Sequence, residues 1–133
     1  MKKLFFIFLI VTSSSLHAEW KFIGSDSKGD KFFFDSERVK EIDGLRYSFE
    51  LINYQKENNG VLSGLAYIKT DCKRKRAKIL NLKFYSEPNG HGDILYEAGE
   101  GVWRYAQLDD PGATRRKKIC ELGVNKILPS LNK

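Results

Sequence analysis

The chain has 133 residues, with 23 lysines and arginines against 17 aspartates and glutamates, which gives a formal net charge of +6. Hydrophobic residues make up 41% of the chain and aromatic residues 13%, enough to build a core, so the composition excludes an intrinsically disordered protein. The length suits one domain, and the modest positive charge disfavours nucleic acid as the partner.

Residues 1–18 have the pattern of a secretory signal peptide. Met1-Lys2-Lys3 is positive, Leu4 to Val11 is an unbroken apolar run, and Ala18 closes a stretch of mostly small polar residues. The apolar run is far shorter than the about 20 residues that span a bilayer, and no longer one follows, so the sequence excludes an integral membrane protein.

Cleavage after Ala18 removes two of the basic residues and leaves 19–133 as a single mature domain with a net charge of +4. We therefore expect an exported protein that is periplasmic, secreted or surface-associated. No cysteine lies near the cleavage site, so we expect no lipid anchor.

Hydrophobic periodicity predicts an antiparallel sheet. The clearest alternation runs over 45–51, where Leu45, Tyr47, Phe49 and Leu51 alternate with Arg46, Ser48 and Glu50. An opening hairpin is expected before it and further strands after it, at 20–23, 31–35, 61–70 and 77–85, with weaker candidates at 93–96 and 102–105. The mixed pattern of 77–85 predicts a strand covered on both sides, and Asn58-Asn59-Gly60 and Pro88-Asn89-Gly90 predict turns.

One helix has clear end signals. Asp110 can cap its N-terminus, Pro111 suits the first helical position and Gly123 is a stop signal, so the sequence predicts a helix over 111–122. An exported chain meets an oxidising compartment, so we expect its two cysteines, Cys72 and Cys120, to pair, with two free buried thiols as the alternative. The fold class is therefore α+β: an antiparallel sheet of five to six strands, with a C-terminal helix packed on it and one disulfide.

The order of these landmarks resembles the surface-adhesin protein E-like family of Gram-negative bacteria, over nearly all of residues 19–121. The landmarks that carry the resemblance are Trp20, Phe33-Phe34-Asp35, Gly44, Phe49, Asp71-Cys72, Arg76, Tyr85, Trp103, Pro111-Gly112 and Ile119-Cys120. The resemblance implies a small disulfide-bonded antiparallel fold with a helix on the sheet. It also implies adhesion to host extracellular-matrix and serum proteins. Phe49 stands where such chains often carry tryptophan, a difference that keeps an aromatic core position and says little about function.

The mature chain offers little for catalysis. His91 is its single histidine and lies in a glycine-rich turn, so we interpret it as an exposed turn residue, with a general base or metal ligand as the alternative. Zinc spacings, phosphate-binding glycine loops and calcium-loop patterns are absent from the sequence. We expect no enzyme, no cofactor and no metal.

Two basic clusters flank the cysteines and are the candidate contact with a partner: Lys73, Arg74, Lys75 and Arg76 after Cys72, and Arg115, Arg116, Lys117 and Lys118 before Cys120. A disulfide would bring the clusters together, and a helix starting at Pro111 would add N–H groups that favour anions in the same region. The alternative is a solvated charged surface, since nearby acidic residues can neutralise the clusters and neighbouring strand residues point to opposite faces.

Two functions follow from these features. The first is a non-enzymatic, adhesin-like binding protein that engages host matrix or serum proteins, or polyanionic macromolecules, through the basic clusters. The alternative is a periplasmic structural or accessory protein whose partner is another envelope component, which the expected lack of a lipid anchor favours.

Overall fold

The computed structural model describes residues 18–105, 107 and 110–123, so nearly all of the predicted signal peptide lies outside the described residues. The strands are β1 (Trp20–Ser25), β2 (Lys31–Asp35), β3 (Lys40–Ile42), β4 (Leu45–Asn58), β5 (Val61–Asp71), β6 (Arg76–Tyr85), β7 (Ile94–Ala98) and β8 (Arg104–Tyr105). A 3-10 turn, η1 (Pro88–Gly90), precedes β7, and the helix α1 (Pro111–Glu121) ends the described chain. Within the described ranges we find no helix with the length and apolar character of a membrane span.

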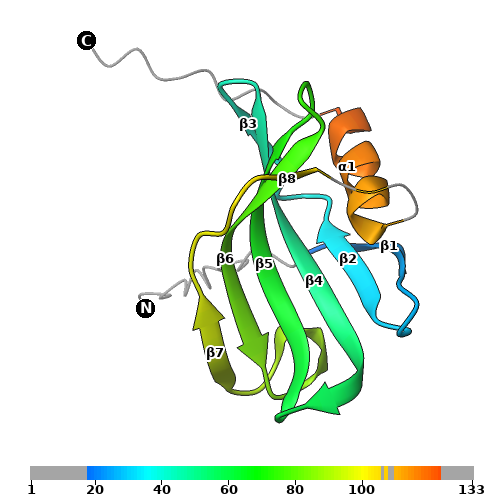
Figure 1. Cartoon of the computed structure of the whole chain (residues 1–133), viewed down its shortest axis with the longest axis vertical. Coiled ribbons are helices and arrows are strands. Elements are labelled where there is room, and N and C mark those ends of the chain that lie inside the picture. The colour runs from blue at the N-terminus through cyan, green and yellow to red at the C-terminus, as the bar shows by residue number, and fades with distance from the viewer. Residues whose placement is uncertain (1–17, 106, 108–109, 124–133) are drawn as a thin grey trace, which may run out of the picture.

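All strand pairs are antiparallel and form one sheet in the order β1-β2-β4-β5-β6-β7, with β3 paired to β4 and β8 paired to β6 (Figure 1). This confirms the predicted α+β class and the opening hairpin. The six strands of the continuous order match the expected number, and the short β3 was not predicted.

The centre of the sheet is the long β4–β5 hairpin, whose turn lies at Asn59 and Gly60. Both turn residues have positive φ, +51° and +81°, as the predicted Asn-Gly turn requires. β4 extends to Asn58, well beyond the alternating segment, and its last four residues are exposed. The prediction that 77–85 is covered on both sides is wrong: none of its residues is fully buried, because little of the described chain covers β6.

The helix begins as predicted. The Asp110 carboxylate accepts a hydrogen bond from Gly112 N at 2.9 Å, and Pro111 occupies the first turn. Its C-terminal end depends on a residue distant in sequence, because the Arg46 guanidinium donates hydrogen bonds to the carbonyls of Ile119 and Leu122. The fully buried Ile119 packs on Ile23 and Phe34, which joins the helix to β1 and β2.

The polar row of β4 faces the helix. Arg46 reaches the C-terminal end of α1, Glu50 pairs with Arg115, and Ser48 is fully buried between them along the strand. The apolar row packs on the opposite face, where the Phe49 ring lies 4.8 Å from Tyr67. The alternation therefore separates the two faces of β4, but the more polar face is the one that α1 covers.

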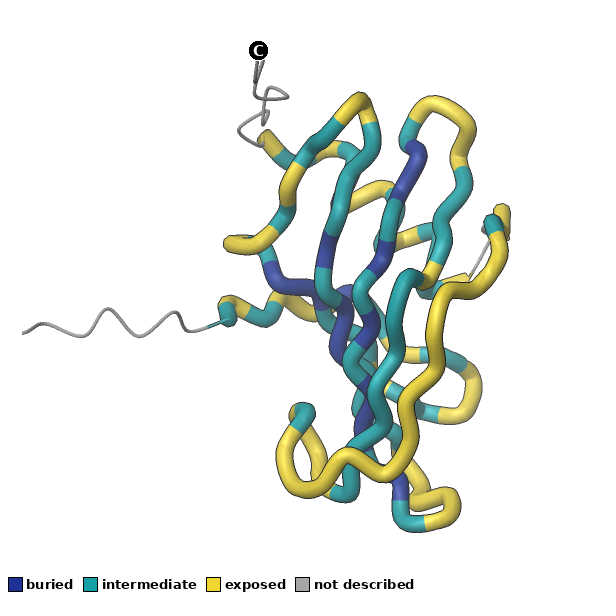
Figure 2. Tube along the Cα trace, turned by 90° about the vertical axis from the view of Figure 1, so that its left-hand side faces the viewer, coloured by how far each residue is buried: buried dark blue, intermediate teal, exposed yellow. Residues whose placement is uncertain are grey.

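One edge of the molecule is open. Every residue from His91 to Val102 is exposed, and Figure 2 shows this stretch running along one side of the sheet while the buried segments lie in the middle strands. His91 lies in the turn after η1, in agreement with its interpretation as an exposed turn residue.

Candidate functional site

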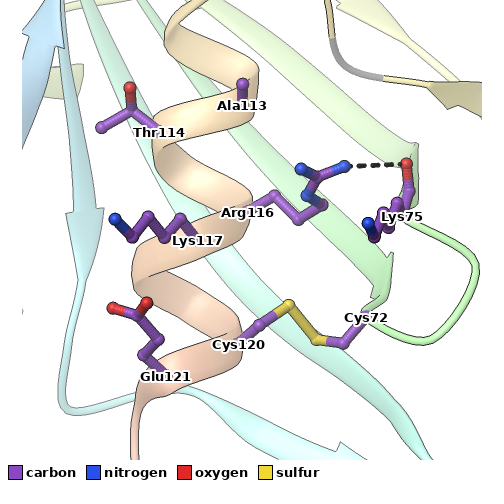
Figure 3. A pocket seen from close by; sticks show the side chains of 8 residues that line it. All are labelled: Cys72, Lys75, Ala113, Thr114, Arg116, Lys117, Cys120 and Glu121. Carbon is purple, nitrogen blue, oxygen red and sulfur yellow. Dashed lines mark hydrogen bonds between the residues drawn. A yellow bond between two sulfur atoms is a disulfide. The ribbon is translucent and has the colours of Figure 1, made fainter. Parts of the chain in front are cut away.

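The disulfide joins the end of a central strand to the last turn of the helix. Cys72 follows β5, Cys120 lies in α1, and their Cα atoms are 5.8 Å apart across a sequence separation of 48 residues (Figure 3). The predicted pairing is confirmed. It places the hairpin turn 72–75, which joins β5 to β6, directly beside the helix.

The turn 72–75 presents Lys73, Arg74 and Lys75 to solvent. Asp71 holds the turn, since its carboxylate accepts a hydrogen bond from Arg74 N at 3.1 Å. Lys75 has a φ of +56°, an unusual conformation for a residue with a side chain, and one that a tight turn requires. Three cations therefore project from a short turn whose backbone is held by a carboxylate and by the disulfide.

The helix adds Arg116 to this turn. Arg116 Nη1 donates a hydrogen bond to the Lys75 carbonyl at 3.1 Å, across a groove of about 430 Å³ that also borders the disulfide. In Figure 3 the Arg116 side chain points toward the turn, whereas Lys117 lies on the other side of the helix. We call the six exposed or half-exposed cations of the turn and helix the basic surface, which extends to both sides of the helix: Lys73, Arg74, Lys75, Arg116, Lys117 and Lys118.

Two of the eight candidate cations lie inside the fold instead. Arg115 Nη1 is 2.9 Å from the Glu50 carboxylate, and the two side chains are only 14% and 6% exposed. Arg76 pairs with Asp71 at 3.4 Å, and its guanidinium stacks 4.3 Å from the centre of the Trp103 ring. Both positive charges are used within the domain, so we leave Arg76 and Arg115 out of the proposed contact.

Glu50 was not predicted as a partner of the second cluster, because 65 residues separate it from Arg115 and no local pattern links them. The pairing of Asp71 with Arg76 has a visible signal, since the two residues flank a four-residue turn between strands. The helix start lies near one residue of the basic surface, because Pro111, Gly112 and Arg116 line the same groove. The Asp110 carboxylate already accepts a hydrogen bond from Gly112 N, so it competes with an external anion for that N–H group.

Asp71 makes the turn sensitive to acid. The hydrogen bond from Arg74 N, and then the Arg76 side chain, hold the pKa of this carboxyl below its ordinary value of 3.8, against the opposing effect of burial. Because the pKa is lowered in the folded state, the ionised carboxylate stabilises the fold at pH values above the ordinary pKa of 3.8. That stabilisation is lost as the pH falls through the lower, folded-state pKa.

We therefore expect Asp71→Asn to destabilise the domain at pH 7, and we expect this destabilisation to shrink as the pH falls below the ordinary carboxyl pKa of 3.8. Urea denaturation of the variant and the wild type across this range measures the difference. Asp93→Asn, in the exposed turn before β7, is the control and should show no comparable convergence. A destabilisation by Asp71→Asn that stays constant down to pH 2 would contradict the assignment.

The described residues contain no group of three His, Cys, Asp or Glu side chains that are placed to hold a metal ion. The chemistry present at the disulfide is therefore cationic and hydrogen-bonding. It suits contact with an anionic surface.

Comparison with known proteins agrees with this architecture. A sequence model of the family described as surface-adhesin protein E matches residues 20–121. Among solved structures, crystal form II of Haemophilus influenzae protein E is similar at a TM-score of 0.55 and 17% identity, over 67% of this chain and 79% of that one. At that identity the likeness shows the fold alone. No curated protein sequence matches the chain significantly.

Proposed function

Because the chain belongs to the surface-adhesin protein E family, we propose that it is an exported, non-enzymatic binding protein that engages an anionic macromolecule through the basic surface. The partner class is a sulfated polysaccharide or an acidic segment of a host matrix or serum protein. The observation that carries the proposal is the placement of turn 72–75 beside Arg116 by the disulfide.

Uncompensated charge supports this choice. None of the six cations of the basic surface makes an ion pair with a described residue, in contrast to Arg76 and Arg115. Two like charges 8 Å apart in water repel by about 0.5 kcal/mol, so each bound anion relieves repulsion as well as forming new contacts. Charge-assisted hydrogen bonds from arginine to sulfate or carboxylate add directional recognition.

Retention on a heparin column tests the contact. We expect the double variant Lys73→Glu, Arg74→Glu to elute from heparin at clearly lower salt than the wild type, because it places two charges that repel heparin in the turn of the basic surface. The control is Lys31→Glu, Lys83→Glu, which makes the same change in net charge on β2 and β6, and it should elute close to the wild type.

Equal elution of the two double variants would show that retention reports net charge alone and would overturn the contact.

Export is tested separately with protease added to intact cells that produce the protein. An adhesin must be accessible there, so a chain that is protected until the outer membrane is opened would favour the periplasmic accessory protein instead.

A further inference from the structure

A second cavity, of about 690 Å³, lies at the opposite end of the sheet from the disulfide. It is bordered by the loop between β1 and β2 and by the ends of the β4–β5 hairpin, the lower part of the sheet in Figure 1. We call it the distal cavity, and its main lining residues are Lys28, Asp30, Tyr54, Lys56, Phe84 and Tyr96. Its volume is in the range of small-molecule sites.

Aromatic rings form one part of the distal cavity. Phe84 and Tyr96 are directly opposite each other on β6 and β7, and Tyr96 is 56% exposed although it is aromatic. Tyr54 is the third ring, and it has room because Gly64 lacks a side chain: a Cβ there would lie 3.3 Å from the Tyr54 hydroxyl. Burial, together with the carboxylates of Asp30 and Glu50, raises the pKa of Tyr54, so its hydroxyl stays protonated and can donate a hydrogen bond.

Polar groups on a rigid loop form the facing part. The Asp26 carboxylate accepts hydrogen bonds from Lys28 N at 2.9 Å and from Asp30 N at 3.0 Å, which fixes the loop between β1 and β2. Asp30 in turn accepts a hydrogen bond from Gln55 N at 2.9 Å, so its carboxylate is held against β4. A loop that is ordered before binding loses little entropy on binding.

The charge of the distal cavity is unbalanced. Neither Lys28 nor Lys56 makes an ion pair with a described residue, and Asp30 is the one acidic residue in the lining. Asn58 and Asn59, at the hairpin turn, also line the cavity and supply amide donors and acceptors. The lining therefore combines an apolar ring surface, several hydrogen-bonding groups and two cations without an anionic partner.

We propose that the distal cavity binds a pyranose sugar that carries a carboxylate. A sugar ring has an apolar C–H face that packs on a tyrosine ring, and hydroxyl groups that pair with amides and carboxylates. The sugar carboxylate would lie between Lys28 and Lys56, the two unpaired cations. A purely apolar ligand would instead bury these polar groups without partners, at a cost. The site is separate from the basic surface and does not depend on its role.

Titration of the ¹⁵N-labelled full domain with glucuronate, followed by NMR, tests the site. Glucose is the uncharged comparison. We expect glucuronate to shift the amide resonances around Lys28, Lys56 and Tyr96 and to bind more tightly than glucose. Tyr96→Ala should weaken glucuronate binding about tenfold. Tyr105→Ala, which removes a similarly exposed tyrosine (62%) outside the lining, should leave it unchanged.

Lys56→Met should reduce the preference for glucuronate over glucose while keeping the ring contact, because Lys28 remains. Absence of shifts with both sugars would overturn the proposal, as would equal weakening by Tyr96→Ala and Tyr105→Ala. Loss of glucuronate binding in the Lys73→Glu, Arg74→Glu variant, with Tyr96→Ala unaffected, would move the sugar to the basic surface and also overturn it. Stronger shifts of the same resonances by a glutamate-containing tripeptide would assign the cavity to peptide instead.

Discussion

Replacing both cysteines, as Cys72→Ala and Cys120→Ala, should lower the free energy of unfolding by about 4 kcal/mol. The disulfide closes a loop of 48 residues and so lowers the conformational entropy of the unfolded state. Without the bond the unfolded chain regains this entropy, and the folded state becomes relatively less stable. Since small domains are stable by only about 5–15 kcal/mol, this one change removes a large share of the total. Urea denaturation monitored by tryptophan fluorescence gives the difference.

Reduction supplies the matched control for this prediction. Wild type treated with dithiothreitol should fall to the stability of the double variant, whereas the variant itself should not respond to the reductant. The helix should also separate from the turn 72–75 more readily, which hydrogen exchange of the last turn of α1 would detect. A variant as stable as the oxidised wild type would show that the remaining contacts of α1 suffice without the bond.

The second large effect concerns Arg115. Arg115→Met should cost about 3 kcal/mol, because it leaves the Glu50 carboxylate, which is almost fully buried, without its partner. Adding Glu50→Leu to the same variant should recover most of the loss, since an apolar pair replaces an ion pair whose desolvation is itself costly. Lys118→Met, at an exposed position of the same helix, should change stability by less than about 0.5 kcal/mol.

Heparin retention separates the two roles that Arg115 could have. If Arg115 acts inside the fold, Arg115→Met should reduce retention less than Lys118→Met does, because Lys118→Met removes one charge of the basic surface. A variant that keeps full stability but loses most of its retention would return Arg115 to the basic surface. The same comparison can be made for Arg76, whose guanidinium is held between Asp71 and Trp103.

Much of the fold follows from short-range signals. Asn59-Gly60 requires left-handed backbone that few other residues adopt easily, and Asp110-Pro111 satisfies the first turn of a helix, so both features were predictable in place. β3 was missed because three residues are too few for a recognisable period. The end of β4 was missed because its last four residues are polar and exposed, so no hydrophobic alternation marks them; Asn58 pairs with Val61 of β5 after an irregularity in the register.

The candidate site was only partly predictable from the sequence, because one of its two ion pairs is local and the other joins distant residues. Asp71 and Arg76 flank one turn and could be paired by inspection, whereas Glu50 and Arg115 meet only because α1 lies across β4. A run of four cations on a helix does not reveal which of their side chains points into the fold. That depends on whether an acidic side chain of another element lies opposite each cation.

The amino-acid sequence alone determined the antiparallel α+β class, the helix start and the pairing of Cys72 with Cys120, because hydrophobic alternation, capping and a single possible cysteine pair are properties of the chain itself. Only the tertiary structure decided which face of β4 the helix covers, and so which cations stay free for a partner. The physical reason is that burial and charge neutralisation are set by neighbours distant in sequence, and local order does not encode them.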